Sequence, residues 1–269
     1  MKSVLLHVND DAGQEARLLA ALVIVRQHDA QLTCVQVTPV SDFVVTDPFG
    51  GTYEVKTLFE ALAKQAVEAR DKIEVRLAEE GIEWQWSIHD GEVAGTIVRR
   101  SQLCDLIVLS QADSARGARA HPLSLVADVA VHARTPVLAV PLTAPAFAPG
   151  GVALVAWNGS PEAAHALRAA LPMLKLASAV HVITFQEYMD LPLDDVRRYL
   201  AAHDVAAECV EHRLDGKSVG EALCVAATQH MAAYLVMGAY GHSRFREAVL
   251  GGVSRHMLAH SPVPLLLAH

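Results

Sequence analysis

The residue types best suited to chemistry lie in a glycine-rich segment near the end of the chain. Gly238 and Gly241 follow an apolar run that is typical of a buried strand, and nine residues separate Gly241 from Gly251, which precedes a helical run. Glycine lets backbone N–H groups approach an anion closely. The N-terminus of a helix adds unpaired N–H donors and a partial positive charge. This spacing between a strand and a helix therefore indicates a loop that binds phosphate.

Polar side chains beside these glycines strengthen that interpretation. His242 and Arg244 could bring positive charge to the loop, and the hydroxyl of Ser254 could donate in the first turn of the following helix. In a doubly wound sheet such a loop lies at the carboxyl ends of the strands, where ligands bind. The alternative interpretation is structural, in which the glycines only form turns and begin a helix.

The elements that would position this loop belong to an α/β fold. Short apolar runs with strand character alternate with longer runs of helical period along the whole chain. The pattern runs once through residues 1–142, meets a linker-like segment rich in proline, alanine and glycine over residues 142–151, and restarts through residues 151–269. This order predicts two doubly wound, Rossmann-like domains, 1–142 and 151–269, each with a five-stranded parallel sheet in strand order 3-2-1-4-5.

The two halves have the character of internal repeats. Residues 106–109 align with residues 234–237, and Pro136 aligns with Pro264 at the same spacing. The first strands align at a different spacing, Val4 with Val152, so the first half carries extra residues in its long second helix and the loop before it. A constant spacing over two separate elements is hard to obtain by chance, which favours two repeated domains over one large α/β domain.

The glycine spacing and the repeated order of elements resemble the universal stress protein family. That family's pattern is glycine, two residues, glycine, nine residues, glycine and then a small hydroxyl residue, and it binds ATP. This chain departs from the pattern at Gly252, which replaces the hydroxyl residue, and at Asn158, where the family often has an Asp near the ribose. The resemblance covers both halves and implies a stress-response protein with a regulatory role.

The resemblance also implies a ligand and its place. The ligand is an adenine nucleotide, ATP or the related ADP or AMP, with or without magnesium, held by the second half. Its adenine would lie near the ends of the first two strands of that half. The binding residues expected are Gly238, Gly241, His242, Arg244, Gly251, Gly252, Val253, Ser254, Ala156, Trp157, Asn158 and Thr184. Gly238→Val and Gly241→Val are expected to abolish binding, because a branched side chain would fill the space that the phosphates need.

The first half lacks the same loop. At the aligned positions it has Ser110, Asp113, Leu123 and Ser124 in place of the glycines, and Asp113 would put negative charge where phosphate would lie. Asp10 matches the family's ribose acid, but one acid does not make a site. We therefore expect residues 1–142 to form a degenerate, structural domain, and whether it binds any ligand stays open.

Two other classes of function remain open beside a regulatory nucleotide binder. One is a nucleotide-free interaction module, and the other is a slow ATPase. The chain has no Walker-type GxxxxGK[ST], GxGxxG or GxSxG motif. Asn158 stands where an acid would be expected, so a carboxylate that could hold a metal ion is not evident. We therefore expect ATP turnover to be slow or absent, and the sequence leaves open whether the protein is an enzyme.

Composition narrows the class of protein and its partners. The net charge of −8 argues against a nucleic-acid partner, and no apolar run reaches the eighteen residues of a membrane span. Four widely spaced cysteines in apolar segments predict buried, reduced thiols and a cytoplasmic protein. The apolar final strand, residues 263–268, would be an exposed edge. The resemblance implies that such strands pair domain to domain, which predicts an intrachain pseudo-dimer and leaves a homodimer of chains open.

Two smaller motifs receive structural interpretations. Ser160, followed by Pro161, is typical of a helix N-cap and not of a nucleophile. His256 and His260 have a helical spacing that can bind metal, but no Glu or Cys stands in register with them, so we expect no metal site there.

Overall fold

The computed structural model describes residues 1–38, 55–111, 124–142, 147–185, 191–241 and 252–269. The elements of the first half are β1 (Ser3–Val8), α1 (Gln14–His28), β2 (Gln31–Thr38), α2 (Val55–Glu79), β3 (Trp84–Asp90), α3 (Val93–Arg100), a 3-10 turn (Ser101–Leu103), β4 (Leu106–Ser110), α4 (Leu125–His132) and β5 (Val137–Val140). The elements of the second half are β6 (Val152–Ala156), α5 (Pro161–Leu174), β7 (Ala179–Thr184), α6 (Leu193–Ala202), β8 (Glu208–Glu211), α7 (Val219–Gln229), β9 (Tyr234–Gly238), α8 (Gly252–His260) and β10 (Leu265–Ala268).

All ten of these strands form one sheet. Its order is β3-β2-β1-β4-β5-β10-β9-β6-β7-β8, so each half has its own strands in the order 3-2-1-4-5. Every pairing within a half is parallel. The predicted fold class is therefore confirmed, and pairing between the halves joins the two five-stranded sets into one sheet.

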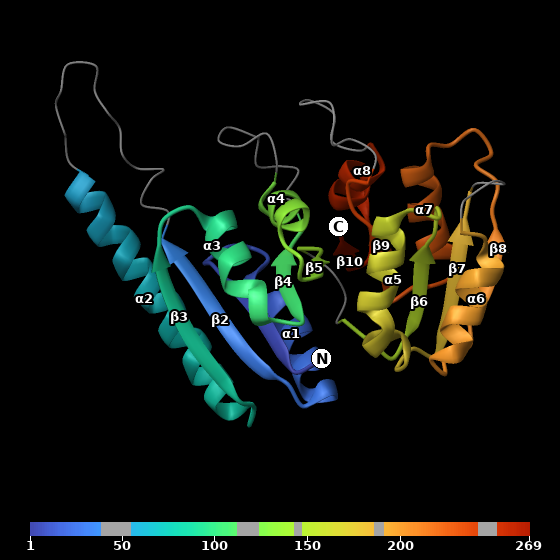
Figure 1. The fold of residues 1–269 in the computed structure, drawn as a ribbon. Coiled ribbons are helices and arrows are strands. Elements are labelled where there is room, and N and C mark those ends of the chain that lie inside the picture. The colour runs from blue at the N-terminus through green and yellow to red at the C-terminus, as the bar shows by residue number, and fades with distance from the viewer. Residues whose placement is uncertain (39–54, 112–123, 143–146, 186–190, 242–251) are drawn as a thin grey trace, which may run out of the picture.

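The two halves meet through β5 and β10, which lie side by side at the centre of the molecule (Figure 1). The pairing is antiparallel, with Leu266 opposite Leu138 and Leu265 opposite Ala139. On its other side β10 pairs with β9. The final strand is thus not an edge, and its pairing forms the contact between halves that the sequence predicted within one chain.

Helices cover both faces of this sheet and bury an apolar core on each. One core lies under α1, α2, α5 and α6 and includes Leu138 and Leu266. The other lies under α3, α4, α7 and α8 and includes Val137 and Leu265. Because successive residues of a strand point to opposite faces, β5 and β10 contribute to both cores. Each core is therefore continuous across the junction between the halves.

The segment that resembles a linker is partly packed into this fold. Phe147 is 5% exposed, and its ring meets that of Tyr234 edge-on at 5.9 Å between centroids. Residues 143–146 lie outside the described residues. The composition of 142–151 suggested a spacer, whereas its aromatic residue is anchored in the core. The division of the chain into domains at this segment stays a prediction.

The structure bears on three further expectations from the sequence. The four cysteines are free thiols, but only Cys34 is buried, while Cys104, Cys209 and Cys224 are half-buried. Within the described part of the chain, no group of His, Cys, Asp and Glu side chains could hold a metal ion alone, and the rings of His256 and His260 stack instead. None of the described helices has the length and apolar character that a membrane crossing needs.

Truncating the leucines that face each other across β5 and β10 should destabilise the whole chain. Leu138→Ala and Leu266→Ala are each expected to lower the free energy of unfolding by about 2–5 kcal/mol, because both side chains are fully buried. The double variant should lose less than the sum, since either truncation already removes their shared contact. Urea unfolding followed by circular dichroism measures all three values.

Leu103→Ala is the matched control for this prediction. Its side chain is 93% exposed, so the free energy of unfolding should change by no more than about 0.5 kcal/mol. Strictly additive losses in the double variant would show that the halves are not coupled through this pair.

Candidate functional site

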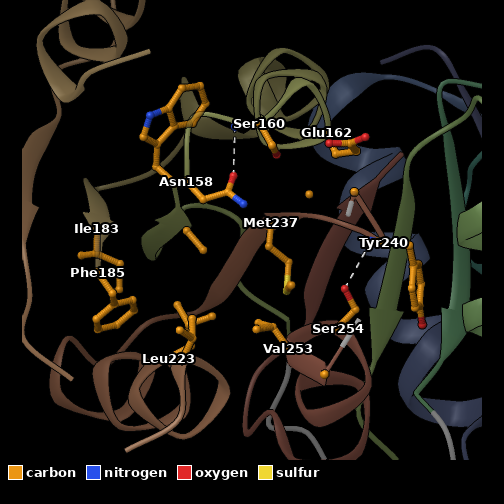
Figure 2. Close-up of a pocket in the computed structure, with 16 residues that line it drawn as sticks. Asn158, Ser160, Glu162, Ile183, Phe185, Leu223, Met237, Tyr240, Val253 and Ser254 are labelled. Atoms are coloured by element: carbon orange, nitrogen blue, oxygen red, sulfur yellow. Dashed lines mark hydrogen bonds between the residues drawn. The ribbon is translucent and has the colours of Figure 1, made fainter. Parts of the chain in front are cut away.

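A pocket of about 340 Å³ lies in the second half, at the carboxyl ends of β6, β7 and β9. The N-terminal turns of α5, α7 and α8 complete its wall, so it occupies the place where doubly wound folds bind ligands (Figure 2). Its lining residues are Ala156, Trp157, Asn158, Ser160, Glu162, Ile183, Phe185, Val219, Leu223, Met237, Gly238, Tyr240, Gly241, Gly252, Val253 and Ser254.

Most of the residues that the sequence singled out meet at this pocket. The described ones that line it are Gly238, Gly241, Gly252, Val253, Ser254, Ala156, Trp157 and Asn158. His242, Arg244 and Gly251 lie outside the described residues. Segments that are far apart in the sequence therefore converge on one cavity.

Thr184 is the exception among the described site residues. It is 1% exposed and does not line the pocket, whereas its neighbours Ile183 and Phe185 do. Side chains alternate between the two faces of a strand. Thr184 was chosen because it ends the strand, but its side chain points to the face away from the pocket, whereas those of Ile183 and Phe185 point toward it. The period of two along this strand is the signal that could have found Ile183 and Phe185.

One wall of the pocket is apolar. Ile183 and Phe185 lie together at the end of β7, opposite Leu223 of α7, and Met237 of β9 closes the space between them and the polar side (Figure 2). Ile183, Leu223 and Met237 are all buried. Such a wall suits a flat apolar ring, with a few polar groups at one end to fix its orientation.

The polar side of the pocket begins at Asn158, whose side chain has a defined orientation. The backbone N–H of Ser160 donates to Asn158 Oδ1 at 3.1 Å. Because a backbone N–H can only donate, this bond assigns the oxygen, and the amide nitrogen is left on the side of Met237 (Figure 2). Where the family resemblance places a carboxylate that accepts, this chain therefore presents an N–H donor.

Ser160 is the N-cap that the sequence predicted. Its hydroxyl oxygen accepts a hydrogen bond from the N–H of Ala163 at 3.1 Å, and Pro161 occupies the first helical position. The cap fixes where α5 begins and therefore where the side chain of Glu162 stands. Sequence analysis did not assign Ser160 or Glu162 to the pocket.

The glycines after β9 make room for the protein itself. A Cβ on Gly238 would lie 2.5 Å from the backbone nitrogen of Ala163, and one on Gly241 would lie 2.5 Å from Glu162 Oε2. At Gly238 the overlap is with the backbone of α5, so a side chain cannot be accommodated there without a shift of the helix, whereas at Gly241 it is with the end of a side chain that can move. The expectation that a side chain at Gly238 would mainly fill the space of the phosphates was wrong, since it would first collide with α5.

Gly252 differs from the other two described loop glycines. A Cβ built there would meet nothing within 4 Å. It is the first residue of α8 and lines the pocket. Backbone N–H groups in the first turn of a helix have no partner within the helix. The open space beside Gly252 is therefore where an anion could reach the N-terminus of α8.

The loop is also tied to α8 through Tyr240. Its backbone N–H donates to Ser254 Oγ at 3.3 Å, and its φ of 60° lies in the left-handed region. A non-glycine residue there costs about 1–2 kcal/mol, which the surrounding packing must offset.

Burial raises the pKa of the Tyr240 phenol to about 12, so the ring is neutral. The hydroxyl of Ser254 accepts the bond from the Tyr240 N–H but can still donate its own hydrogen. It therefore remains available as a donor to a ligand.

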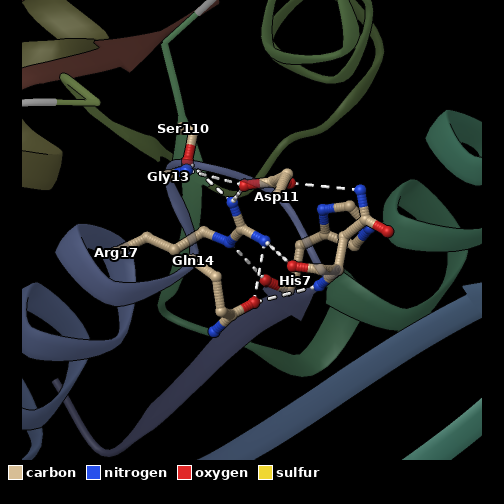
Figure 3. Close-up of polar contacts among 7 residues, drawn as sticks. His7, Asp11, Gly13, Gln14, Arg17 and Ser110 are labelled. Atoms are coloured by element: carbon tan, nitrogen blue, oxygen red, sulfur yellow. Dashed lines mark hydrogen bonds and ion pairs between the residues drawn. The ribbon is translucent and has the colours of Figure 1, made fainter. Parts of the chain in front are cut away.

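A buried arginine lies at the ends of β1 and β4 in the first half. Arg17 is 1% exposed and makes five hydrogen bonds, shown in Figure 3. Its partners, all at 2.6–2.8 Å, are the backbone oxygens of His7 and Asn9 and the side chains of Asp11, Ser110 and Gln14. Since a guanidinium has five N–H groups, all of its donors are used.

Electrostatics in this cluster follow from the buried guanidinium. Burial, and then the charge of Arg17, lowers the pKa of His7 to about 3, so the ring is neutral. Burial opposes the ionisation of Asp11, but the hydrogen bond and charge of Arg17 lower its pKa overall. A cavity of about 320 Å³ remains beside the cluster, and Asp11, not Asp10, lines it. Asp113 and Leu123 lie outside the described residues.

Alanine substitutions should distinguish Gly238, which packs against α5, from Gly252, which faces open space. Gly238→Ala is expected to lower the free energy of unfolding by about 1–3 kcal/mol, because its methyl group would overlap the backbone of α5. Gly252→Ala should leave it unchanged or raise it by up to about 1 kcal/mol, since the space is open and alanine favours the helix. Thermal and urea unfolding measure both, and equal effects would contradict this account of α5.

Comparison with known proteins supports the fold described above. Residues 152–269 match the model of the universal stress protein family. A universal stress protein from Archaeoglobus fulgidus superposes with a TM-score of 0.77 at 16% identity, covering 99% of this chain and 96% of that one. A candidate universal stress protein from Pseudomonas aeruginosa gives 0.61 at 18% identity, covering 100% and 93%. The chain has no match among curated proteins. Its fold is thus that of these structures, and residues 152–269 form a universal stress protein domain.

Proposed function

We propose that the second half binds one adenine nucleotide in the pocket between β6, β7 and β9, and that the protein acts as a regulatory binder in a stress response. The observation that carries this proposal is the convergence of the glycine loop, the N-terminus of α8 and the ends of β6 and β9 on one cavity. The end of β9, the loop and α8 follow one another along the chain, whereas β6 (Val152–Ala156) is far from them in the sequence.

The pocket suits the parts of such a nucleotide in order. The adenine ring would lie against the apolar wall of Ile183, Phe185 and Leu223. The ribose would lie near the amide of Asn158, which offers donors to hydroxyl oxygens. The phosphates would then extend toward Gly252 and Ser254, where the first turn of α8 provides unpaired N–H groups.

We also propose that residues 1–142 are a degenerate domain of the same family. The strand order of that half supports this, and so does Ser110, which stands at the position aligned with Gly238 and is bonded to the buried Arg17. Four free thiols favour a reducing compartment, and we propose the cytoplasm. Since β10 already pairs on both sides, any homodimer would have to use another surface.

The stoichiometry and place of binding can be tested together. Calorimetry with ATP is expected to find one site per chain, and Gly252→Leu should weaken binding at least about tenfold, because its side chain would enter the space open to the phosphates. Gly252→Ser, which adds a hydroxyl donor at the same position, should bind at least as tightly as the native chain. Adenine nucleotide released on denaturing the purified protein would identify the natural ligand.

Two results would count against this proposal. Two equal sites per chain would show that the first half also binds. A native chain that binds no adenine nucleotide and shows no thermal shift with ATP would favour a nucleotide-free interaction module.

Turnover of ATP is expected to be slow or absent. Among the described residues, the donors proposed for the phosphates are backbone N–H groups of the first turn of α8 and the hydroxyl of Ser254. Donors that hold substrate and transition state about equally do little for the catalytic rate. Single-turnover hydrolysis with magnesium or manganese should run far below the enzyme median of roughly 10 per second. A rate near that value, lost in Gly252→Leu, would establish an enzyme.

A further inference from the structure

The pocket contains a carboxylate that sequence analysis did not place there. Among the described lining residues Glu162 is the one charged side chain, and it comes from the first turn of α5. It is separated from the glycine loop by more than seventy positions of sequence, so the fold and not a local motif brings it to the pocket.

Glu162 stands directly against the glycine loop. A Cβ on Gly241 would lie 2.5 Å from Glu162 Oε2 and 3.4 Å from Glu162 Oε1, so the carboxylate occupies the space left by the missing side chain. Figure 2 shows its oxygens at the loop side of the pocket. The N-cap at Ser160 fixes the turn from which it projects, and the positive end of the helix favours a negative side chain in this turn.

This position puts negative charge in the lining of the pocket proposed for the nucleotide, beside Gly241 of the glycine loop. No lysine or arginine is found among the described residues that line the pocket. Like charges at a few ångströms repel, and more strongly where protein replaces water. Glu162 therefore disfavours a free nucleoside triphosphate, with its several negative charges, at this end of the pocket.

A divalent cation reverses that mismatch. Magnesium in proteins is usually held by one or two carboxylates together with the phosphates of a substrate. Glu162 can supply one such carboxylate, and the described residues contain no group of His, Cys, Asp and Glu that could hold a metal ion alone. The donor set therefore fits a cation that arrives with the nucleotide and does not fit a resident metal ion.

We infer that Glu162 makes the pocket select the magnesium complex of a nucleoside polyphosphate over the free polyphosphate. The inference rests on the proposed nucleotide site and assigns its selectivity to one side chain. AMP, which carries less charge and a shorter phosphate chain, should depend less on magnesium than ATP does.

Equilibrium dialysis with labelled ATP tests the inference directly. The native chain is expected to bind ATP at least about tenfold more tightly in magnesium chloride than in EDTA, as the charge argument requires. Glu162→Gln keeps the size of the side chain and removes its charge, so it should bind free ATP more tightly than the native chain and lose most of the effect of magnesium. Glu83→Gln, an exposed carboxylate in the first half, should retain the full effect.

The outcomes separate this inference from the proposed function. Equal binding in magnesium and EDTA by the native chain would overturn the role of Glu162 while leaving the nucleotide site intact, as would a full magnesium effect in Glu162→Gln. No binding of any adenine nucleotide by either chain would overturn both. Circular dichroism confirms that each variant is folded, and Glu162→Ala replaces Glu162→Gln if that variant is not.

Discussion

The antiparallel pairing of β5 with β10 is the constraint on which the rest of the molecule depends. A five-stranded sheet that ends in a short, wholly apolar strand leaves unpaired backbone groups at an edge that cannot face water without cost. Joining two such edges satisfies both with the same hydrogen bonds. It also merges the cores on each face, since Leu138 and Leu266 belong to one and Val137 and Leu265 to the other. The halves therefore share their stability as well as their sheet.

The repeated halves bring the same two elements close together by different means. In the second half the strand side gives way, because Gly238 at the end of β9 has no side chain and the first turn of α5 fits against it. In the first half the helix side gives way, because a Cβ on Gly13 would lie 2.2 Å from Ser110 Oγ at the end of β4. In this contact between a strand end and a helix start, the glycine thus belongs to the strand in the second half and to the helix start in the first half. This exchange explains how the first half accommodates Ser110 where the second half has Gly238.

Local patterns predicted the fold and much of the site, but not the contacts between elements. Alternating apolar runs predicted the α/β order, and the spacing of Gly238, Gly241 and Gly251 predicted a ligand site at the strand end where the pocket lies. Thr184 was misplaced because the strand was considered by its end and not by its faces. Glu162 was missed because only the close approach of α5 to the loop, a tertiary contact, brings it there. The pairing of β5 with β10, which joins the two sheets, is also a contact between strands distant in the sequence, and local patterns do not show it.

The cluster around Arg17 has a consequence for how the two halves can diverge. Each of its five N–H groups has a partner, and the side chain is 1% exposed. Removing one partner, for example the hydroxyl of Ser110, would leave a buried donor unsatisfied at a cost of about 1–3 kcal/mol. Ser110→Gly, which would give this half the residue found at the aligned position of the second half, would therefore weaken the protein even if it enlarged the cavity beside the cluster.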